Sequence, residues 1–212
     1  MMRFAALESF ARAPLAAVVD PSDRCGLCAG PVDPRHSHVV DLQRQALACA
    51  CRACHLVLAH PGAAASRYRT LPVRVLVDPS FALSDAQWGR LTIPVGLAFL
   101  CRQGDGRWVA TYPSAAGATQ AELPPDAWQE VAQAPLVAAV APEVEALLVR
   151  ARRGAAGRET FLVPIDVCYS LVGLVRRQWR GLSGGEALWR GVDAFFAEVR
   201  ARARPLRGEE TR

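Results

Sequence analysis

The sequence contains no lysine and no asparagine, so all 25 of its basic residues are arginines. Without lysine, the chain has no Schiff-base lysine, no P-loop lysine and no kinase-type ATP-binding lysine. Histidine is also scarce, and the four histidines are His36, His38, His55 and His60. Acid–base chemistry that depends on histidine is therefore not expected after residue 60. No catalytic constellation is visible, and we expect a protein that is not an enzyme.

Long apolar runs are absent as well. No stretch reaches the ~18 uninterrupted apolar residues that a membrane helix needs. Residues 1–17 are mildly apolar, but they contain Glu8 and Arg12 and lack the ordered regions of a signal peptide. We therefore expect a cytoplasmic protein with no membrane segment. In that reducing compartment, clustered cysteines are expected to bind metal rather than form disulfides.

The net charge of +5 would ordinarily suggest a nucleic-acid partner. However, the absence of lysine together with abundant alanine looks like the codon bias of a GC-rich genome. Acidic residues are also interspersed among the arginines throughout the chain. Nucleic acid is therefore an unfavoured partner, and a zinc-ribbon nucleic-acid-binding protein is kept as an alternative function.

Cysteine is the residue type with an informative pattern. Five of the seven cysteines lie within thirty residues, and they are Cys25, Cys28, Cys49, Cys51 and Cys54. Two C-x-x-C hooks separated by about 15–20 residues are typical of a four-thiolate metal site. Each hook turns two sulfurs toward one centre, and two hooks complete a tetrahedron. The sequence predicts one metal ion bound by Cys25, Cys28, Cys51 and Cys54.

Other ligand sets remain open. Cys49 and Cys51 would point to the same side of a strand, so Cys49 could be an alternative or extra ligand. His36 and His38 lie on the same expected hairpin and could replace a sulfur. A tetrahedral four-sulfur site suits both zinc and iron. The layout resembles zinc ribbons and rubredoxin-like knuckles, but Ala29 and His55 stand where rubredoxins usually have glycine, so zinc is favoured over iron.

The expected fold class is α+β. A zinc-ribbon-like four-cysteine module covers residues 23–62, with a hairpin formed by 38–42 and 45–49 between its two hooks. A mixed sheet-and-helix domain covers residues 66–204 and ends in two amphipathic helices. Residues 1–22 form an N-terminal arm, residues 61–66 a linker and residues 205–212 a flexible tail. Strands are expected in the larger domain at 71–77, 93–102, 107–112, 144–149 and 160–165.

Helices in the larger domain have recognisable starts. Ser84 and Gln87 form a capping-box pattern, and Pro125 lies near the first turn of a helix over 125–133. Asp166 is expected to be the N-cap of the first of the two final helices. Cys101 and Cys168 lie on apolar patterns and are expected to be core residues.

Nine short motifs occur along the chain. They are Cys25-x-x-Cys28, His38 with Asp41, Cys49-Ala-Cys51-x-x-Cys54, Arg67-Tyr68-Arg69, Gln87-Trp88, Ile93 to Phe99, Tyr112-Pro113, Val163-Pro-Ile-Asp166-x-Cys168-Tyr169 and Trp179 to Gly185. Together they resemble an uncharacterised bacterial family, a domain of unknown function whose genes often lie beside nickel–iron hydrogenase genes. The resemblance runs from about residue 22 to residue 204.

This resemblance implies a metal-binding accessory or scaffold protein of a nickel–iron hydrogenase system. The expected partner is a hydrogenase subunit or a maturation factor. A rubredoxin-like electron-transfer partner, with iron in the site, is an alternative. All five tryptophans lie in the larger domain, and tryptophan often anchors protein interfaces. The larger domain is accordingly expected to bind a protein and to expose at least one tryptophan.

Overall fold

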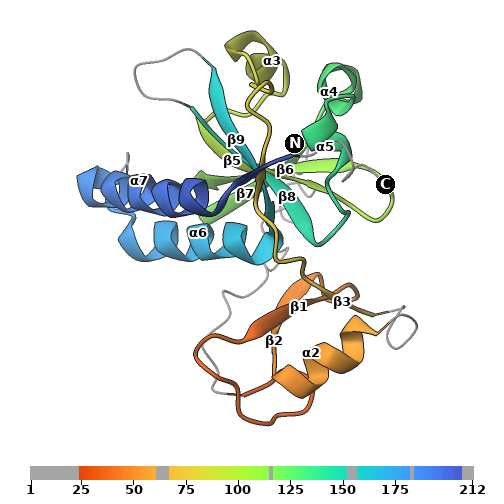
Figure 1. Cartoon of the computed structure of the whole chain (residues 1–212). Coiled ribbons are helices and arrows are strands. Elements are labelled where there is room, and N and C mark those ends of the chain that lie inside the picture. The colour runs from red at the N-terminus through yellow and green to blue at the C-terminus, as the bar shows by residue number, and fades with distance from the viewer. Residues whose placement is uncertain (1–23, 61–66, 115–116, 152–156, 182–183, 207–212) are drawn as a thin grey trace, which may run out of the picture. The chain divides into compact units, whose positions relative to one another are not determined.

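The computed structural model describes residues 24–60, 67–114, 117–151, 157–181 and 184–206 (Figure 1). These residues form a mixed α+β protein, which confirms the predicted fold class. The chain divides into two compact units, Met1–Tyr68 and Arg69–Arg212. The N-terminal arm and the linker predicted at 61–66 lie outside the described residues, and the predicted domain boundaries stay a prediction.

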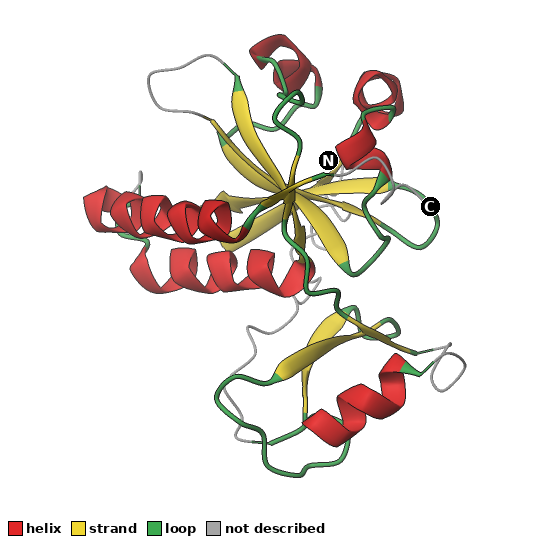
Figure 2. Cartoon of the chain, viewed as in Figure 1, coloured by secondary structure: helices red, strands yellow, loops and turns green. Residues whose placement is uncertain are grey.

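The first unit contains the hairpin that the sequence predicts. Strands β1 (Ser37–Asp41) and β2 (Ala46–Ala50) pair antiparallel, with His38 opposite Cys49. Strand β3 (Tyr68–Thr70) begins at the last residue of this unit and follows β1 in the strand order β2-β1-β3. Helix α2 (Arg52–Ala59) follows β2 directly and is the helix of this unit in Figure 2. The sequence analysis did not predict this helix.

Asp41 fixes the tip of the hairpin. Its carboxylate accepts backbone hydrogen bonds from Gln43 at 3.1 Å and Arg44 at 3.2 Å. The same carboxylate accepts two side-chain hydrogen bonds from Arg67, at 2.8 and 3.1 Å to one oxygen. The Arg67 guanidinium lowers the pKa of Asp41, and the two backbone donors lower it further while burial opposes them. Asp41 therefore joins the hairpin turn to the segment that leads into β3.

The second unit is built on a seven-stranded sheet with strand order β10-β4-β9-β8-β5-β6-β7. Neighbouring strands are antiparallel except for β10 and β4, which are parallel. The strands are β4 (Leu76–Val77), β5 (Leu97–Arg102), β6 (Trp108–Ser114), β7 (Gly117–Glu122), β8 (Glu145–Ala151), β9 (Arg158–Pro164) and β10 (Arg204–Pro205).

Helices cover both faces of this sheet, as Figure 2 shows. The core on one face includes residues of α3 (Asp85–Arg90), α4 (Pro125–Ala132) and α5 (Pro135–Ala138). The long helices α6 (Ile165–Gln178) and α7 (Gly185–Arg202) cover the other face. Aromatic contacts join them to the strands, with ring centroids 6.1 Å apart for Phe99 and Tyr169 and 6.4 Å apart for Phe161 and Phe196. Because both faces are covered, β8 and β9 are almost entirely buried.

A buried ion pair fixes the start of β8. The carboxylate of Glu145 is fully buried and accepts two hydrogen bonds from the guanidinium of Arg74, at 2.7 and 2.9 Å. The backbone N–H of Ala141 donates a third at 2.9 Å, and Arg74 also donates to the carbonyl of Ala139. The strand predicted at 71–77 is shorter than expected, since only its last two residues form β4.

Most of the other predicted elements of this unit are present. The Ser84 capping box is formed, since Gln87 N–H donates to Ser84 Oγ and Ser84 N–H donates to Gln87 Oε1. The prediction for Asp166 was wrong, because Pro164 is the N-cap of α6 and Asp166 lies in the first turn. The predicted tail begins inside β10, which contains Pro205, and its last six residues lie outside the described part of the chain.

Candidate metal centre

The first hook is a tight turn. The backbone N–H of Cys25 donates to the Gly30 carbonyl at 2.7 Å, and Ala29 N–H donates to the Cys25 carbonyl at 2.8 Å. An isolated β-bridge between Arg24 and Pro31 closes the base of the turn. Ala29 has φ = 58°, a left-handed conformation that glycine normally supplies. The backbone thus makes the turn that glycine allows in similar hooks, with alanine in its place.

The second hook is the start of a helix. Cys51 is the N-cap of α2, and its Sγ accepts a hydrogen bond from the backbone N–H of Cys54 at 3.5 Å. Free N–H groups and the helix dipole make the first turn of a helix favourable for thiolates. The C-x-x-C spacing predicts a second cysteine turn at this position. The structure instead has one turn and one helix N-terminus, with the hairpin between them.

The two hooks meet because the first one packs against β2. Gly26 donates its N–H to the carbonyl of Cys49 at 2.8 Å. A Cβ at Gly26 would lie 3.1 Å from the Cβ of Ala48, which is closer than side chains normally approach. Glycine at this position therefore lets the turn approach the end of the strand that leads into α2.

All four predicted ligands converge. The sulfurs of Cys25, Cys28, Cys51 and Cys54 lie within 4.8 Å of one another, and those of Cys28 and Cys51 are 3.7 Å apart. A tetrahedral site with metal–sulfur bonds of about 2.3 Å has sulfur–sulfur edges of about 3.8 Å. A disulfide would need about 2.05 Å, and all seven cysteines are free thiols. The cluster is compatible with binding one metal ion.

The cluster is electrostatically prepared for a cation. Burial raises the pKa of Cys25, but hydrogen bonds from the backbones of Cys51, Cys28 and Leu27 outweigh it and lower the pKa to about 6. Hydrogen bonds from the Cys28 and Cys51 side chains, with burial, raise the pKa of Cys54 to about 12. One thiolate thus forms readily, while its negative charge disfavours ionisation of the next thiol. A bound divalent cation would remove that repulsion, because metal binding requires deprotonated thiols.

Cys49 lies apart from this cluster. Its sulfur groups with ring nitrogens of His36 and His38, and the three ligand atoms lie within 4.8 Å of one another. Cys49 is 3% exposed, at the end of β2 that pairs with His38. The structure therefore separates Cys49 from the four thiols.

The other two cysteines lie in the core of the second unit, as predicted. Cys101 is 8% exposed and Cys168 is fully buried. Burial raises the pKa of Cys101 to about 12 and raises that of Cys168 well above its ordinary value. Both are therefore neutral thiols at physiological pH.

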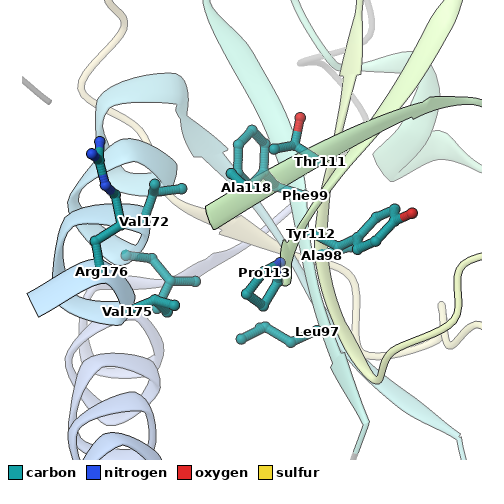
Figure 3. Close-up of a pocket in the computed structure, with 11 residues that line it drawn as sticks. Leu97, Ala98, Phe99, Thr111, Tyr112, Pro113, Ala118, Val172, Val175 and Arg176 are labelled. Atoms are coloured by element: carbon teal, nitrogen blue, oxygen red, sulfur yellow. The ribbon is translucent and has the colours of Figure 1, made fainter. Parts of the chain in front are cut away.

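Figure 3 shows a pocket in the second unit between the sheet and α6. Leu97, Pro113, Val172 and Val175 are among the side chains that line it. Of the described residues around this pocket, none is a cysteine or a carboxylate. The pocket therefore offers an apolar surface and no paired acid–base groups.

The tryptophans of the second unit do not match the prediction of an exposed anchor. Trp88 and Trp128 are buried, and Trp108, Trp179 and Trp189 are partly buried. The exposed large apolar side chains among the described residues are Leu56, Val57 and Val73. The expectation of an exposed tryptophan was therefore wrong.

The architecture and the cysteine cluster define a two-unit α+β protein with a site compatible with metal binding. Residues 24–203 match the model of DUF5947, a family of unknown function, and the chain belongs to this family. This result confirms the predicted membership of an uncharacterised family. No curated protein and no solved structure matches the chain. Within the described residues, no helix combines the length and apolarity needed to cross a membrane.

Proposed function

We propose that this chain is a zinc-binding accessory or scaffold protein of a nickel–iron hydrogenase system. The observation that carries the proposal is the convergence of four cysteine sulfurs from two C-x-x-C hooks. We propose that the first unit is a zinc-ribbon-like module; in support, a hairpin separates the two cysteine hooks, although the second hook starts a helix. A closed four-cysteine site of this kind most often holds a fold together.

A structural role for the metal is supported by how little else holds α2. The helix has eight residues, and of these described residues none is buried. Helices shorter than about 12–15 residues are marginal in water without packing. Cys51 and Cys54 attach the helix to the first hook if both bind the ion. Zinc coordination would thus contribute on the order of 10 kcal/mol to the free energy of folding, which packing of the helix does not supply.

The hydrogenase setting rests on the family resemblance described above, and the partner is proposed to be a hydrogenase subunit or a maturation factor. Leu56 and Val57 on α2 are 57% and 60% exposed, so they offer an apolar contact directly beside the second hook. We place the partner contact on this helix rather than on the tryptophans, because none of the tryptophans is exposed.

The chain is proposed to act without enzymatic chemistry. In support, Cys101 and Cys168 are buried neutral thiols, and the pocket beside α6 is lined mainly by apolar groups. The second unit also has neither lysine nor histidine. A group that activates a nucleophile or transfers a proton near neutral pH would have to come from a carboxylate or tyrosine.

Two alternatives lead to different measurements. A rubredoxin-like electron-transfer partner would hold iron in the same four sulfurs and show thiolate-to-iron absorption with a reversible one-electron wave. A zinc-ribbon nucleic-acid-binding protein needs arginines that face phosphate. Many described arginines instead form ion pairs with carboxylates, including Arg67, Arg74, Arg107, Arg150, Arg158 and Arg200.

The partner proposal is tested by capture of tagged protein from its native host. We expect a hydrogenase subunit or maturation factor to be recovered, and the double variant Leu56→Ser/Val57→Ser to lose it. The single variant Val73→Ser is the control, because Val73 is also exposed but lies in the second unit. Recovery of no hydrogenase component by the unaltered chain would contradict the hydrogenase assignment.

A further inference from the structure

The hairpin carries a second group of metal-ligating side chains that the four-cysteine site does not use. His36 directly precedes β1 and His38 is the second residue of that strand, and their rings contact each other edge to face. Cys49 is directly opposite His38 on β2. A ring nitrogen of each histidine and the sulfur of Cys49 lie within 4.8 Å of one another. Strand pairing thus brings two imidazoles and one thiol together.

His36 is already oriented as a metal ligand. Its Nδ1 lies 2.7 Å from the backbone carbonyl oxygen of Asp33. A carbonyl only accepts hydrogen bonds, so Nδ1 is the donor, and in the neutral imidazole Nε2 then presents a lone pair. Metal-bound histidines commonly donate their other ring N–H to a backbone carbonyl in this way, which fixes the ring orientation.

The free nitrogen of His36 is shielded from water. Nε2 is buried and has no hydrogen-bond partner within the described part of the chain. A buried polar atom without a partner costs roughly 1–3 kcal/mol, and it is often satisfied by an ion or an ordered water. The ring centroids of His36 and His38 are 4.9 Å apart, and a ring nitrogen of each lies within 4.8 Å of the other and of the Cys49 sulfur. A cation there would satisfy the nitrogen.

We propose that His36, His38 and Cys49 form a second metal site for a zinc-class divalent cation. Two imidazoles and one thiolate are a ligand set that zinc accepts. Three protein ligands leave the fourth tetrahedral position open to water or to an exchangeable ligand, whereas the four-cysteine site is closed. The second site therefore holds its ion less tightly and is the exchangeable site of the protein. Binding removes one proton, which passes from the Cys49 thiol to solvent.

The test uses the full chain as purified, with its tightly held metal left in place. Co²⁺ is added in steps, because a tetrahedral cobalt site with a thiolate ligand absorbs visible and near-ultraviolet light. We expect one equivalent of Co²⁺ to bind. His36→Gln and His38→Gln should each weaken it by more than about tenfold, since losing even an outer-shell partner costs about 10–100-fold. His60→Gln is the matched control, because His60 is exposed beyond the end of α2.

Zinc released during the titration is measured in parallel, so that displacement from the four-cysteine site is recognised. Absence of a tetrahedral cobalt spectrum, a spectrum unaltered in both histidine variants, or a spectrum matched by zinc release would overturn the second site. None of these outcomes bears on the four-cysteine site. That site is tested separately, by whether the purified protein contains metal and whether Cys28→Ser removes it.

A measurement on the unaltered chain guards against variants that fail to fold. Ring-nitrogen NMR of the four histidines should show His36 and His38 shifting on addition of one equivalent of Zn²⁺, while His60 stays in place. Unchanged His36 and His38 resonances would contradict the proposal.

Discussion

At the scale of single residues, Ala29 is one of two described non-glycine positions of the first unit with a positive φ, the other being Gln45 in the hairpin turn. Its φ of 58° places an alanine where the backbone favours glycine. The left-handed conformation costs a residue with a Cβ about 1–2 kcal/mol. Part of this cost is offset because glycine is more flexible in the unfolded chain. Alanine at this position is therefore mildly destabilising to the first hook.

Ala29→Gly should strengthen the module. The expected gain is about 0.5–1 kcal/mol, which corresponds to a roughly two- to fivefold higher zinc affinity in competition with a chelator. Ala53→Gly is the control with the opposite sign, because residue 53 lies in helix α2 and glycine there costs about 1 kcal/mol. An affinity lowered by Ala29→Gly would contradict the strained turn.

Arg74 is expected to stabilise the second unit, because its guanidinium neutralises the fully buried carboxylate of Glu145. Arg74→Ala leaves Glu145 charged and fully buried, and we expect a loss of about 3–5 kcal/mol in the free energy of unfolding. Tryptophan fluorescence during urea unfolding measures this, since all five tryptophans lie in the second unit.

Arg190→Ala is the control for that measurement. It breaks an exposed i,i+4 pair with Glu186 and should cost no more than about 0.5 kcal/mol. Equal effects of the two variants would show that burial of Glu145 does not set the energy of its ion pair.

The thiols of Cys101 and Cys168 give a pH prediction. Burial raises the pKa of Cys101 to about 12 and that of Cys168 upward as well, so the thiolate of neither residue is populated near neutrality. We expect neither to react with iodoacetamide between about pH 7 and 9 in the folded chain. Both should react after denaturation. Peptide mass spectrometry that finds either one alkylated in folded protein would argue for an accessible, activated thiol.

The four thiols of the cluster could be predicted from the sequence, because C-x-x-C spacing limits where the sulfurs can point. It did not locate the partners of buried charges. Glu145 and Arg74 are 71 residues apart, and their pairing depends on which strand lies beside which. The roles of Cys49 and Cys51 were also left open, because β2 ends at Ala50 and Cys51 leaves the strand to begin α2. Alternation along a strand no longer applies beyond that point.

At the scale of elements, α2 depends most directly on the metal. Its described residues include none that is buried, and its own length is too short for independent stability. Removal of the metal with a chelator should therefore melt α2 while the strands of the second unit stay protected. Hydrogen exchange followed by mass spectrometry measures both regions in one sample.

The backbone amides of Arg52–Ala59 should lose protection in the chelated protein and regain it when zinc is restored. Leu56→Ser is the control, because an exposed side chain should change stability by less than about 0.5 kcal/mol. Persistent protection of α2 without metal would mean that packing, and not coordination, holds the helix.

Elements with strong local signals were predictable. The Ser84 capping box, the proline at the start of α4 and the two final amphipathic helices each followed from a local rule. Strand β7 gave no such signal, because its alanine, glycine and threonine residues form no alternating apolar pattern. Helix α2 was missed for a related reason. Its half-buried residues Cys54, His55 and Leu58 do lie at helical spacing, but eight residues show only about two turns of that periodicity.

At the scale of the whole molecule, the two units are stabilised in different ways. The second unit has a sheet covered on both faces and a large apolar core. Among the described residues of the first unit, those that are apolar and buried are small, namely Cys25, Val39, Val40, Cys49 and Ala50. A module with so small a core generally requires a metal or disulfides. The first unit is therefore expected to depend on metal in the four-cysteine site.

The most direct test of metal binding by the four-cysteine site is the metal content and absorption spectrum of protein purified without added metal. We predict about one tightly bound zinc per chain, no visible colour, loss of the metal in Cys28→Ser and its retention in Cys101→Ala. The matched variants each remove one thiol, but only Cys28 belongs to the cluster. Protein without stoichiometric metal, or metal that survives Cys28→Ser, would contradict a four-cysteine centre. A red protein with thiolate-to-iron absorption would contradict zinc and favour electron transfer.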